Sequence, residues 1–201
     1  AYQLSKRIAG KILLLDGNEI ASQASARAAC LLTRARTKPA LMELVQETYD
    51  CIKEIEVLLD ESLELQQCGS VTIASSDSSL KGLDALEEAA TRFGIPNERI
   101  SRERVKELLP WIESDSVDVA LYMPTDAFID SALLCSGYAR AAAKLGVELK
   151  PNCKVKEIIV EQDEIRGVSL VNGERLNAPI VVNAAGSWAN LLMRPLKVGL
   201  P

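Results

Sequence analysis

A carboxylate stands directly after the first strongly apolar run of the chain. Residues 11–16 read Lys-Ile-Leu-Leu-Leu-Asp, and such a run is typical of a strand that is buried on both faces of a parallel sheet. Asp16 would then lie at the carboxyl end of the strand, where a carboxylate can accept hydrogen bonds from both hydroxyls of an adenosine ribose. The alternative is a turn-forming aspartate in Asp16-Gly17-Asn18, which needs no ligand.

A block rich in small residues follows Asp16. Residues 20–30 read Ile-Ala-Ser-Gln-Ala-Ser-Ala-Arg-Ala-Ala-Cys, so the backbone there could closely approach a flat or phosphorylated ligand. A helix that begins near Ser25 would direct its free N–H groups and its positive dipole end at an anion such as a pyrophosphate. The same pattern also suits a Ser-capped helix that packs tightly on a sheet.

Composition excludes several other kinds of site. The chain has 201 residues and no His, which removes His-containing zinc sites and Ser-His or Cys-His nucleophile systems. The five Cys include no C-x-x-C pair, so we expect no metal site and a reducing, cytoplasmic location. The net charge of -5 provides no basic field for nucleic acid. No apolar run approaches the roughly 20 residues of a transmembrane segment, and the N-terminal residues do not resemble a signal peptide.

The elements that would position these residues follow from periodicity and capping signals. Residues 1–9 predict a helix that ends at Gly10, and apolar residues at helical spacing predict one long helix or two abutting helices within residues 39–66. Further helices are expected at 79–93, 101–109 and 131–145, the last capped by Asp130. Strands are expected at 71–74, 119–123, 147–150 and 179–183, and a β-meander at 154–161, at 165–171 and in a short run up to residue 176. The layout predicts two lobes, with α/β segments at both ends of the chain and a mixed helix and strand insert between them.

Several of these segments together resemble the D-amino acid oxidase and glycine oxidase superfamily. The initial helix, the strand that ends at Asp16 and the block at 20–30 resemble the start of that family. Later segments resemble it in the same order, namely residues 68–71, 122–130, 146–149 with Val155 and Ile158, and 182–189. The resemblance covers nearly the whole chain, and the shared order of the motifs is its main support.

The resemblance implies a fold and a cofactor. The fold would be α/β, with an FAD-binding, Rossmann-like parallel sheet and the β-meander in residues 1–37 and 131–201, and a mixed α+β part of the substrate-binding lobe in residues 38–130. Asp16 would bind the adenosine ribose of FAD, and Val155 would face adenine through its backbone. The remaining contacts to the pyrophosphate, ribitol and isoalloxazine would come from Ser22, Ser25, Ala26, Arg27, Ala28, Ala185, Gly186 and Trp188. For Val155 and Trp188, plain core packing is the alternative.

The chain departs from the family pattern at three places. No G-x-G-x-x-G occurs among its 11 glycines, although the family places that loop just before the helix that begins here at Ala1. From the usual spacing of roughly 20 residues between loop and acidic residue, about 10 to 20 residues are expected to be missing. The resemblance also predicts further substrate-lobe strands and a last flavin contact after Pro201. Cys30 stands where the family usually has a small Gly.

The resemblance implies the oxidation of an amine or amino acid at its C–N bond. The flavin would accept a hydride from the carbon that bears the amine, so no protein base is required and no catalytic residue is identified. Arg34 or Arg36 could bind a substrate carboxylate, unless they are ordinary solvated surface residues. Two other readings stay open, a non-catalytic flavoprotein scaffold and a dehydrogenase subunit that passes electrons to a quinone or a protein partner. An oligomer is also compatible with the sequence.

Overall fold

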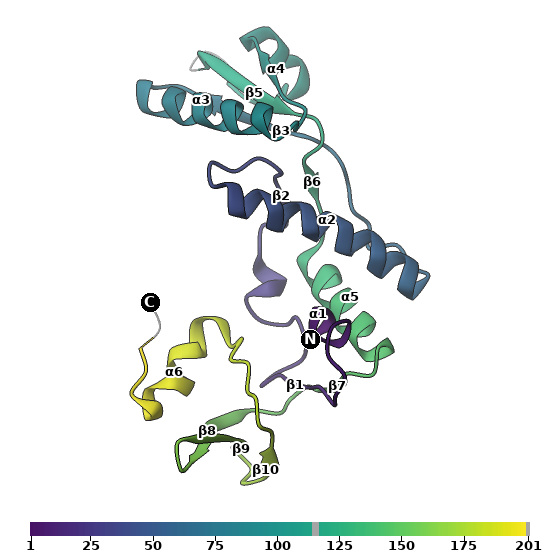
Figure 1. Ribbon diagram of the computed structural model, residues 1–201. Helices are drawn as coiled ribbons and strands as arrows, with labels where there is room; N and C mark the ends of the chain where they lie inside the picture. The colour runs from purple at the N-terminus through teal and green to yellow at the C-terminus, as the bar shows by residue number, and fades with distance from the viewer. Residues whose placement is uncertain (114–116, 200–201) are drawn as a thin grey trace. The chain divides into compact units, whose positions relative to one another are not determined.

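The computed structural model describes residues 1–113 and 117–199, and the chain forms two compact units. The first unit comprises Ala1–Gln23 and Ala139–Pro201, of which residues 200 and 201 lie outside the described part, and the second comprises Ala24–Tyr138. Figure 1 shows the elements of both. The fold is mixed α/β with one parallel strand pair and several antiparallel sheets, as the sequence predicts. The assignment of residues 1–37 and 131–201 to a flavin lobe stays a prediction.

The first unit is built on a parallel strand pair. Strand β1 (Leu13–Leu15) pairs with β7 (Glu148–Lys150) in a register that places Leu15 opposite Lys150. All three residues of β1 are half-buried, so this strand is less enclosed than its apolar run predicts. Helix α1 covers only Tyr2–Ser5, and the predicted helix over residues 1–9 is therefore too long. Tyr2 is its one buried residue, and a helical turn without a packed face gains too little to persist in water.

The predicted β-meander is confirmed. Strands β8 (Val155–Glu161), β9 (Glu164–Leu170) and β10 (Arg175–Asn177) form an antiparallel sheet in the order β10-β9-β8. Gln162 and Asp163 both have positive φ, the backbone conformation that a tight two-residue hairpin turn requires. The buried core of this sheet consists of Ile158, Val168 and Leu170, and Leu15 packs against it.

The strand predicted at residues 179–183 is wrong. This segment has no strand assignment, and it leads into a single 3-10 turn η3 (Gly186–Trp188), a short helix α6 (Ala189–Met193) and a second 3-10 turn η4 (Arg194–Leu196). Val181 packs on the meander core, whereas Ile180 is 78% exposed and Val182 is 69% exposed. An extended segment becomes a strand only where a neighbouring strand accepts and donates its backbone hydrogen bonds.

The second unit contains a three-stranded antiparallel sheet between two helices. Strand β5 (Val119–Met123) lies between β3 (Ser70–Ala74) and β4 (Glu98–Ile100). Leu121 and Met123 of β5 pack with Leu83 of helix α3 (Asp77–Arg92). Ala120, on the opposite face, packs with Val105 of helix α4 (Arg102–Leu108). Successive side chains of β5 point to opposite faces of the sheet, so one face packs on α3 and the other on α4.

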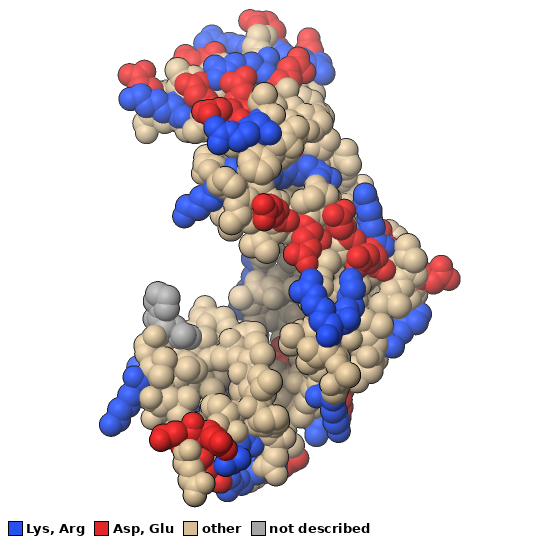
Figure 2. Space-filling view, in the orientation of Figure 1, with Lys and Arg blue, Asp and Glu red and all other residues tan. Residues whose placement is uncertain are grey.

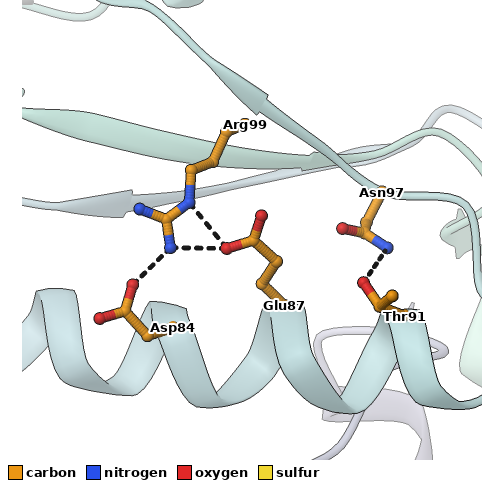
Figure 3. A network of polar contacts seen from close by, with 5 residues as sticks. All are labelled: Asp84, Glu87, Thr91, Asn97 and Arg99. Atoms are coloured by element: carbon orange, nitrogen blue, oxygen red, sulfur yellow. Dashed lines mark hydrogen bonds and ion pairs between the residues drawn. The ribbon is translucent and has the colours of Figure 1, made fainter.

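Local signals place these two helices correctly. Ser76 caps α3 by accepting a hydrogen bond from the Ser79 backbone N–H, and the Ser79 hydroxyl accepts one from the Ser76 N–H, which is a capping box. Ser101 caps α4 through the Arg104 N–H. On the exposed side, Arg99 of β4 forms ion pairs with Asp84 and Glu87 of α3 (Figure 3). Figure 2 shows acidic and basic side chains interspersed over the part of the chain that carries α3.

The second unit also contains the helices α2 and α5 and a two-stranded ladder. The long helix predicted within residues 39–66 is α2 (Pro39–Leu59). A two-stranded ladder, which the sequence does not indicate, joins β2 (Leu31–Leu32) to β6 (Ala127–Phe128). Helix α5 (Ser131–Lys144) begins in this unit, and the Asp130 carboxylate accepts a hydrogen bond from the Leu133 N–H at 2.8 Å. The predicted cap of this helix is therefore confirmed.

Candidate functional site

Asp16 lies at the carboxyl end of β1, as predicted. Its backbone N–H donates to the Lys150 carbonyl at 3.1 Å and its carbonyl accepts from the Cys153 N–H at 2.7 Å. These bonds link the end of β1 to the chain that leads from β7 into β8. The carboxylate oxygen Oδ1 accepts a hydrogen bond from the Asn18 N–H at 3.0 Å. Asp16 therefore makes the local turn that the sequence offers as the alternative, and this turn leaves Oδ2 without a partner among the described residues.

Ser22 lies in the turn that follows β1. Its hydroxyl donates to the Glu19 carbonyl at 2.6 Å, and the Glu19 carboxylate accepts from the Asn152 side chain, next to Cys153. The Ser22 hydroxyl oxygen can still accept a hydrogen bond. Asp16 and Ser22 are thus linked indirectly, Asp16 through Cys153 and Ser22 through Glu19 and Asn152.

The segment Ser25–Ala28 belongs to the second unit, and the helix predicted there is wrong. Only a single 3-10 turn, η1 (Ser25–Arg27), is formed, and Ala28 already has extended backbone angles. One turn carries no substantial helix dipole, so the electrostatic argument for a pyrophosphate at this point fails. The side chains from Ser25 to Ala28 are exposed.

Cys30 closes this segment in a conformation that usually requires glycine. Its φ is 64°, and the left-handed region is unfavourable for residues with a Cβ. Its thiol donates to the Ala28 carbonyl at 3.0 Å and accepts from the Ser131 N–H at 3.1 Å. The preference of the resembled family for Gly at this position therefore has a backbone reason, and the two sulfur contacts help to hold Cys30 there.

The other predicted contacts lie in the first unit. Val155 begins β8 and its side chain packs on the meander core, which is the core-packing alternative. Asn183 organises the turn before α6 by accepting from the Ala185 N–H at 3.2 Å and donating to the Ala189 carbonyl at 3.0 Å. Gly186 has a φ of 53°, and apart from its immediate chain neighbourhood no atom of residues 1–113 and 117–199 lies within 4 Å of where its Cβ would be. Trp188 is 52% exposed, so it is not a core residue.

The two candidate arginines differ in their contacts. The Arg34 guanidinium lies 3.6 Å from the centre of the Tyr49 ring and donates to the Thr125 carbonyl at 3.1 Å and to Gln46 at 2.8 Å. Burial is the main reason that the pKa of the Tyr49 phenol is raised, and the nearby Arg34 charge opposes this shift. Arg34 is therefore held by contacts within the second unit through Nε, Nη1 and its stacking on Tyr49, while Nη2 has no partner among the described residues.

Arg36 lines a cavity of about 230 Å³ in the second unit. One of its guanidinium nitrogens, Nη1, donates to the Thr33 hydroxyl and to the Ala35 carbonyl, and the other two nitrogens have no partner among the described residues. The cavity is also lined by Thr37, Ser70, Thr72, Leu86, Met123 and Asp126. Each of the two arginines proposed from the sequence therefore keeps at least one guanidinium nitrogen without a partner in the described part of the chain.

Asp126 is the residue of this cavity that sequence reasoning missed. It is 1% exposed, and its carboxylate accepts from the Arg34 backbone N–H at 2.7 Å and from the Ser70 hydroxyl at 2.6 Å. The only signal in the sequence is a carboxylate in the otherwise mostly apolar run from Leu121 to Ile129. Burial of a carboxylate is costly without a compensating charge. The two hydrogen bonds from Arg34 and Ser70 therefore matter for keeping Asp126 buried.

The parallel pair β1–β7 with a carboxylate at its carboxyl end, followed by an antiparallel meander, indicates a dinucleotide-binding α/β protein. The chain belongs to the family described as FAD dependent oxidoreductase, which it matches over residues 1–201. The resemblance found in the sequence is thereby confirmed.

Individual relatives support the same family. The chain is 28% identical over 201 residues to 4-methylaminobutanoate oxidase (formaldehyde-forming) of Paenarthrobacter nicotinovorans, covering all of this chain and 24% of the relative. It is 30% identical over 208 residues to mitochondrial sarcosine dehydrogenase of Mus musculus, covering all of this chain and 22% of the relative. The crystal structure of L-proline dehydrogenase from P. horikoshii matches with a TM-score of 0.88 and 25% identity, over 100% of this chain and 53% of that one. The chain thus spans about a quarter or less of the two curated relatives.

Residues 1–113 and 117–199 contain no group of three or more Cys, Asp or Glu side chains that could hold a metal ion. No helix in the same residues is both long and apolar enough to cross a membrane.

Proposed function

We propose that this protein is an FAD-dependent oxidoreductase that oxidises an amine or amino acid at its C–N bond. The observation that carries the proposal is the position of Asp16, a half-buried carboxylate at the carboxyl end of a parallel strand, in a chain that matches the family over its whole length. The names of the relatives support the class of substrate, because they include a methylamino acid, sarcosine and proline.

The residues present fit the adenosine end of FAD. Asp16 keeps one carboxylate oxygen free of local hydrogen bonds, and an ionised carboxylate can accept from both ribose hydroxyls. A Cβ added at Gly17 would lie 3.6 Å from Cγ of Lys154, which is an ordinary van der Waals contact. Gly186 leaves open space beside its backbone, which permits the close approach of a phosphate or ribitol group.

In this proposal the chain binds and orients the cofactor, and bound FAD would accept a hydride from the carbon that bears the amine. Asp16 would hold the ribose, and the backbone around Gly186 would approach the pyrophosphate or ribitol. Ser22, Ser25, Ala26, Arg27 and Ala28 stay predicted contacts on the pyrophosphate and isoalloxazine side. Val155 would contribute its backbone to the adenine site, while its side chain supports the meander core.

A dehydrogenase that passes electrons to a quinone or protein is the second candidate. Two of the three relatives described above are named dehydrogenases and one is named an oxidase. Oxygen consumption after substrate addition would identify an oxidase, whereas reduction of an artificial dye without oxygen consumption would identify a dehydrogenase. A protein that binds FAD but is never bleached by an amine or amino acid would instead be a flavoprotein scaffold.

Substitution of Asp16 tests the cofactor site. Asp16→Asn can still accept the Asn18 N–H and keep the turn, but it loses the negative charge that would hold the ribose. Because a hydrogen bond to a charged group contributes about 1.5–3 kcal/mol, we expect FAD affinity to fall roughly 10- to 100-fold. FMN has no adenosine, so its affinity should not change. Fluorescence titration of the purified protein with both flavins measures this.

Asp163→Asn is the matched control. Asp163 is an exposed aspartate of the same unit, in the turn between β8 and β9 with a φ of 60°, which Asn tolerates well. It should leave the affinity for both flavins unchanged. Equal losses for FAD and FMN in the Asp16 variant, or no loss at all, would remove Asp16 from the adenosine site. A wild-type protein that binds neither flavin would overturn the proposed function.

A further inference from the structure

Ser131 contacts both ends of the segment that runs from Ser25 to Cys30. Its hydroxyl donates to the Ser25 carbonyl, and its backbone N–H donates to the Cys30 thiol sulfur at 3.1 Å. All three residues belong to the second unit. Ser131 is the first residue of α5, and it lies 106 positions after Ser25 and 101 positions after Cys30. One helical residue therefore links both ends of a segment that is distant from it in the sequence.

The interactions within this segment are weak. Its regular structure is the single 3-10 turn η1, and Ala24, which precedes the turn, has no side-chain group that could cap it. The Ser25 carbonyl accepts the Ala28 N–H at 3.3 Å, which is longer than the usual range of about 2.7–3.2 Å. Cys30 has a φ of 64°, which is unfavourable for a residue with a Cβ. The conformation of the segment therefore depends on contacts from outside it.

The residues around the start of α5 supply these contacts. The Ser131 hydroxyl adds a second hydrogen bond to the Ser25 carbonyl, beside the one from the Ala28 N–H. At the other end, the Cys30 carbonyl accepts from the Ile129 N–H at 3.1 Å. The Cys30 thiol donates to the Ala28 carbonyl at 3.0 Å while it accepts from the Ser131 N–H. The sulfur therefore links α5 to the middle of the segment.

We propose that Ser131 is a positioning residue for flavin binding, which holds the segment Ser25–Ala28 against the isoalloxazine ring. The flavin, and the place of Ser25–Ala28 beside it, rest on the proposed function, whereas the contacts of Ser131 do not. The residues of this segment are exposed, so a ligand can reach them, and a displaced backbone would change the fit of a rigid, flat ring. Ser131 acts through Ser25 and Cys30 and needs no contact with the flavin itself.

Ser131→Ala removes the hydroxyl contact and keeps the backbone N–H. Helix α5 keeps its cap, because Asp130 provides it. FAD and FMN share the isoalloxazine ring, so the affinity for both should fall by the same factor, about three- to tenfold for one hydrogen bond. Ser131→Thr retains a hydroxyl and should bind both flavins within about twofold of the wild type, because the hydrogen bond is kept. Fluorescence titration of the purified protein with each flavin measures these affinities.

The absorption spectrum of the bound flavin distinguishes positioning from general stability. At saturating FMN, the visible band should be shifted in Ser131→Ala and restored in Ser131→Thr, because the band responds to the groups around the ring. A lower urea midpoint of the flavin-free variant with an unchanged band would mean a loss of stability alone and would overturn the proposal. Ser136→Ala is the matched control, because this hydroxyl lies in the same helix and donates to the Leu133 carbonyl at 3.0 Å. It should change neither the affinities nor the band.

Cys30 tests the other end of the segment. Cys30→Ala removes the sulfur but keeps a Cβ, so the left-handed conformation loses its support and the affinity for both flavins should fall at least about threefold. Cys30→Gly also removes the sulfur, but glycine adopts this conformation unaided. It should therefore bind both flavins more tightly than Cys30→Ala. Equal affinities of the two variants would overturn the anchoring of the segment through Cys30.

The outcomes separate this proposal from the proposed function. If Ser131→Ala binds both flavins like the wild type, the positioning role is wrong, even when an amine or amino acid bleaches the flavin of the wild type. If both affinities fall together and the band shifts, but no amine or amino acid reduces the flavin, the proposed function fails and the positioning role stands. A loss for FAD but not for FMN would also overturn the positioning role, because it would place the segment at the adenosine end.

Discussion

At the scale of single residues, the hydrogen-bond and stacking partners of a charged side chain decide whether it can bind a ligand. Arg34 and Arg36 are two positions apart and equally charged, but Arg34 stacks on Tyr49 and donates to the distant Thr125 carbonyl, while the hydrogen bonds of Arg36 go to its near neighbours Thr33 and Ala35. Asp16 and Asp126 differ in the same way. One is a partly exposed residue in a turn, and the other is a buried carboxylate bound only by neutral donors.

Tyr49 provides a test of the buried polar cluster around Arg34. Its hydroxyl donates to the Leu32 carbonyl at 2.7 Å and it is 2% exposed. Tyr49→Phe should lower the free energy of unfolding by about 1 kcal/mol near neutral pH, because that hydrogen bond is lost. Urea unfolding followed by circular dichroism measures this difference.

The same variant tests the raised pKa of Tyr49. Because burial raises the pKa of the folded phenol above 10.0, the unfolded chain releases this proton first as the pH rises. The wild type therefore loses stability above about pH 10, whereas Tyr49→Phe lacks this loss. The stability difference between the two proteins should shrink between about pH 9 and about pH 11. A constant difference over this range would contradict the burial of an uncharged phenol.

At the scale of elements, the two helical glycines Gly82 and Gly137 form a matched pair. Outside its own helix backbone and chain neighbours, a Cβ on Gly82 of α3 would meet no atom of the described residues within 4 Å, whereas a Cβ on Gly137 of α5 would lie 2.7 Å from Cδ2 of Leu63. Leu63 is fully buried, so its side chain has little room to move. Gly82→Ala should stabilise the protein by about 0.5–1 kcal/mol, since alanine is the better helix former.

Gly137→Ala should show no such gain and should destabilise the protein, because overpacking a buried contact costs roughly 1–3 kcal/mol. Thermal unfolding of the two variants beside the wild type is the measurement. Stabilisation by both substitutions would mean that α5 and the segment around Leu63 are not packed as the structure shows.

At the scale of the whole molecule, the predicted flavin contacts are divided between the two units. Asp16, Ser22, Val155, Ala185, Gly186 and Trp188 belong to the first, and Ser25–Ala28 belong to the second. The two tryptophans, Trp188 and Trp111, are divided in the same way. Each unit therefore has its own fluorescent reporter when the other tryptophan is replaced by phenylalanine.

FAD should stabilise both units if both sets of contacts are correct. A ligand present at about 100 times its Kd adds about 2.7 kcal/mol to the free energy of unfolding. In Trp111→Phe the urea midpoint reported by Trp188 should rise with FAD, and in Trp188→Phe the midpoint reported by Trp111 should rise as well. A shift for Trp188 alone would exclude Ser25–Ala28 from the flavin site, and Asp16→Asn should reduce both shifts.

The features of this protein that the sequence alone determines are those that depend on local interactions. The caps of α3, α4 and α5, the turn between β8 and β9, and Asp16 at the end of β1 all depend on residues close together in the sequence. Spacing and residue type are sufficient to predict such features. The order of these motifs along the chain was also sufficient to indicate the family.

Only the tertiary structure decided the features that depend on distant residues. The apolar run at residues 179–183 is not a strand, because pairing needs a neighbour that spacing does not reveal. Asp126 is buried beside Arg34 and Ser70, which are 92 and 56 positions away, so no local pattern could show which donors surround it. Burial and partner choice are properties of the folded chain, and they separate Arg36 from Arg34 and reveal the cavity.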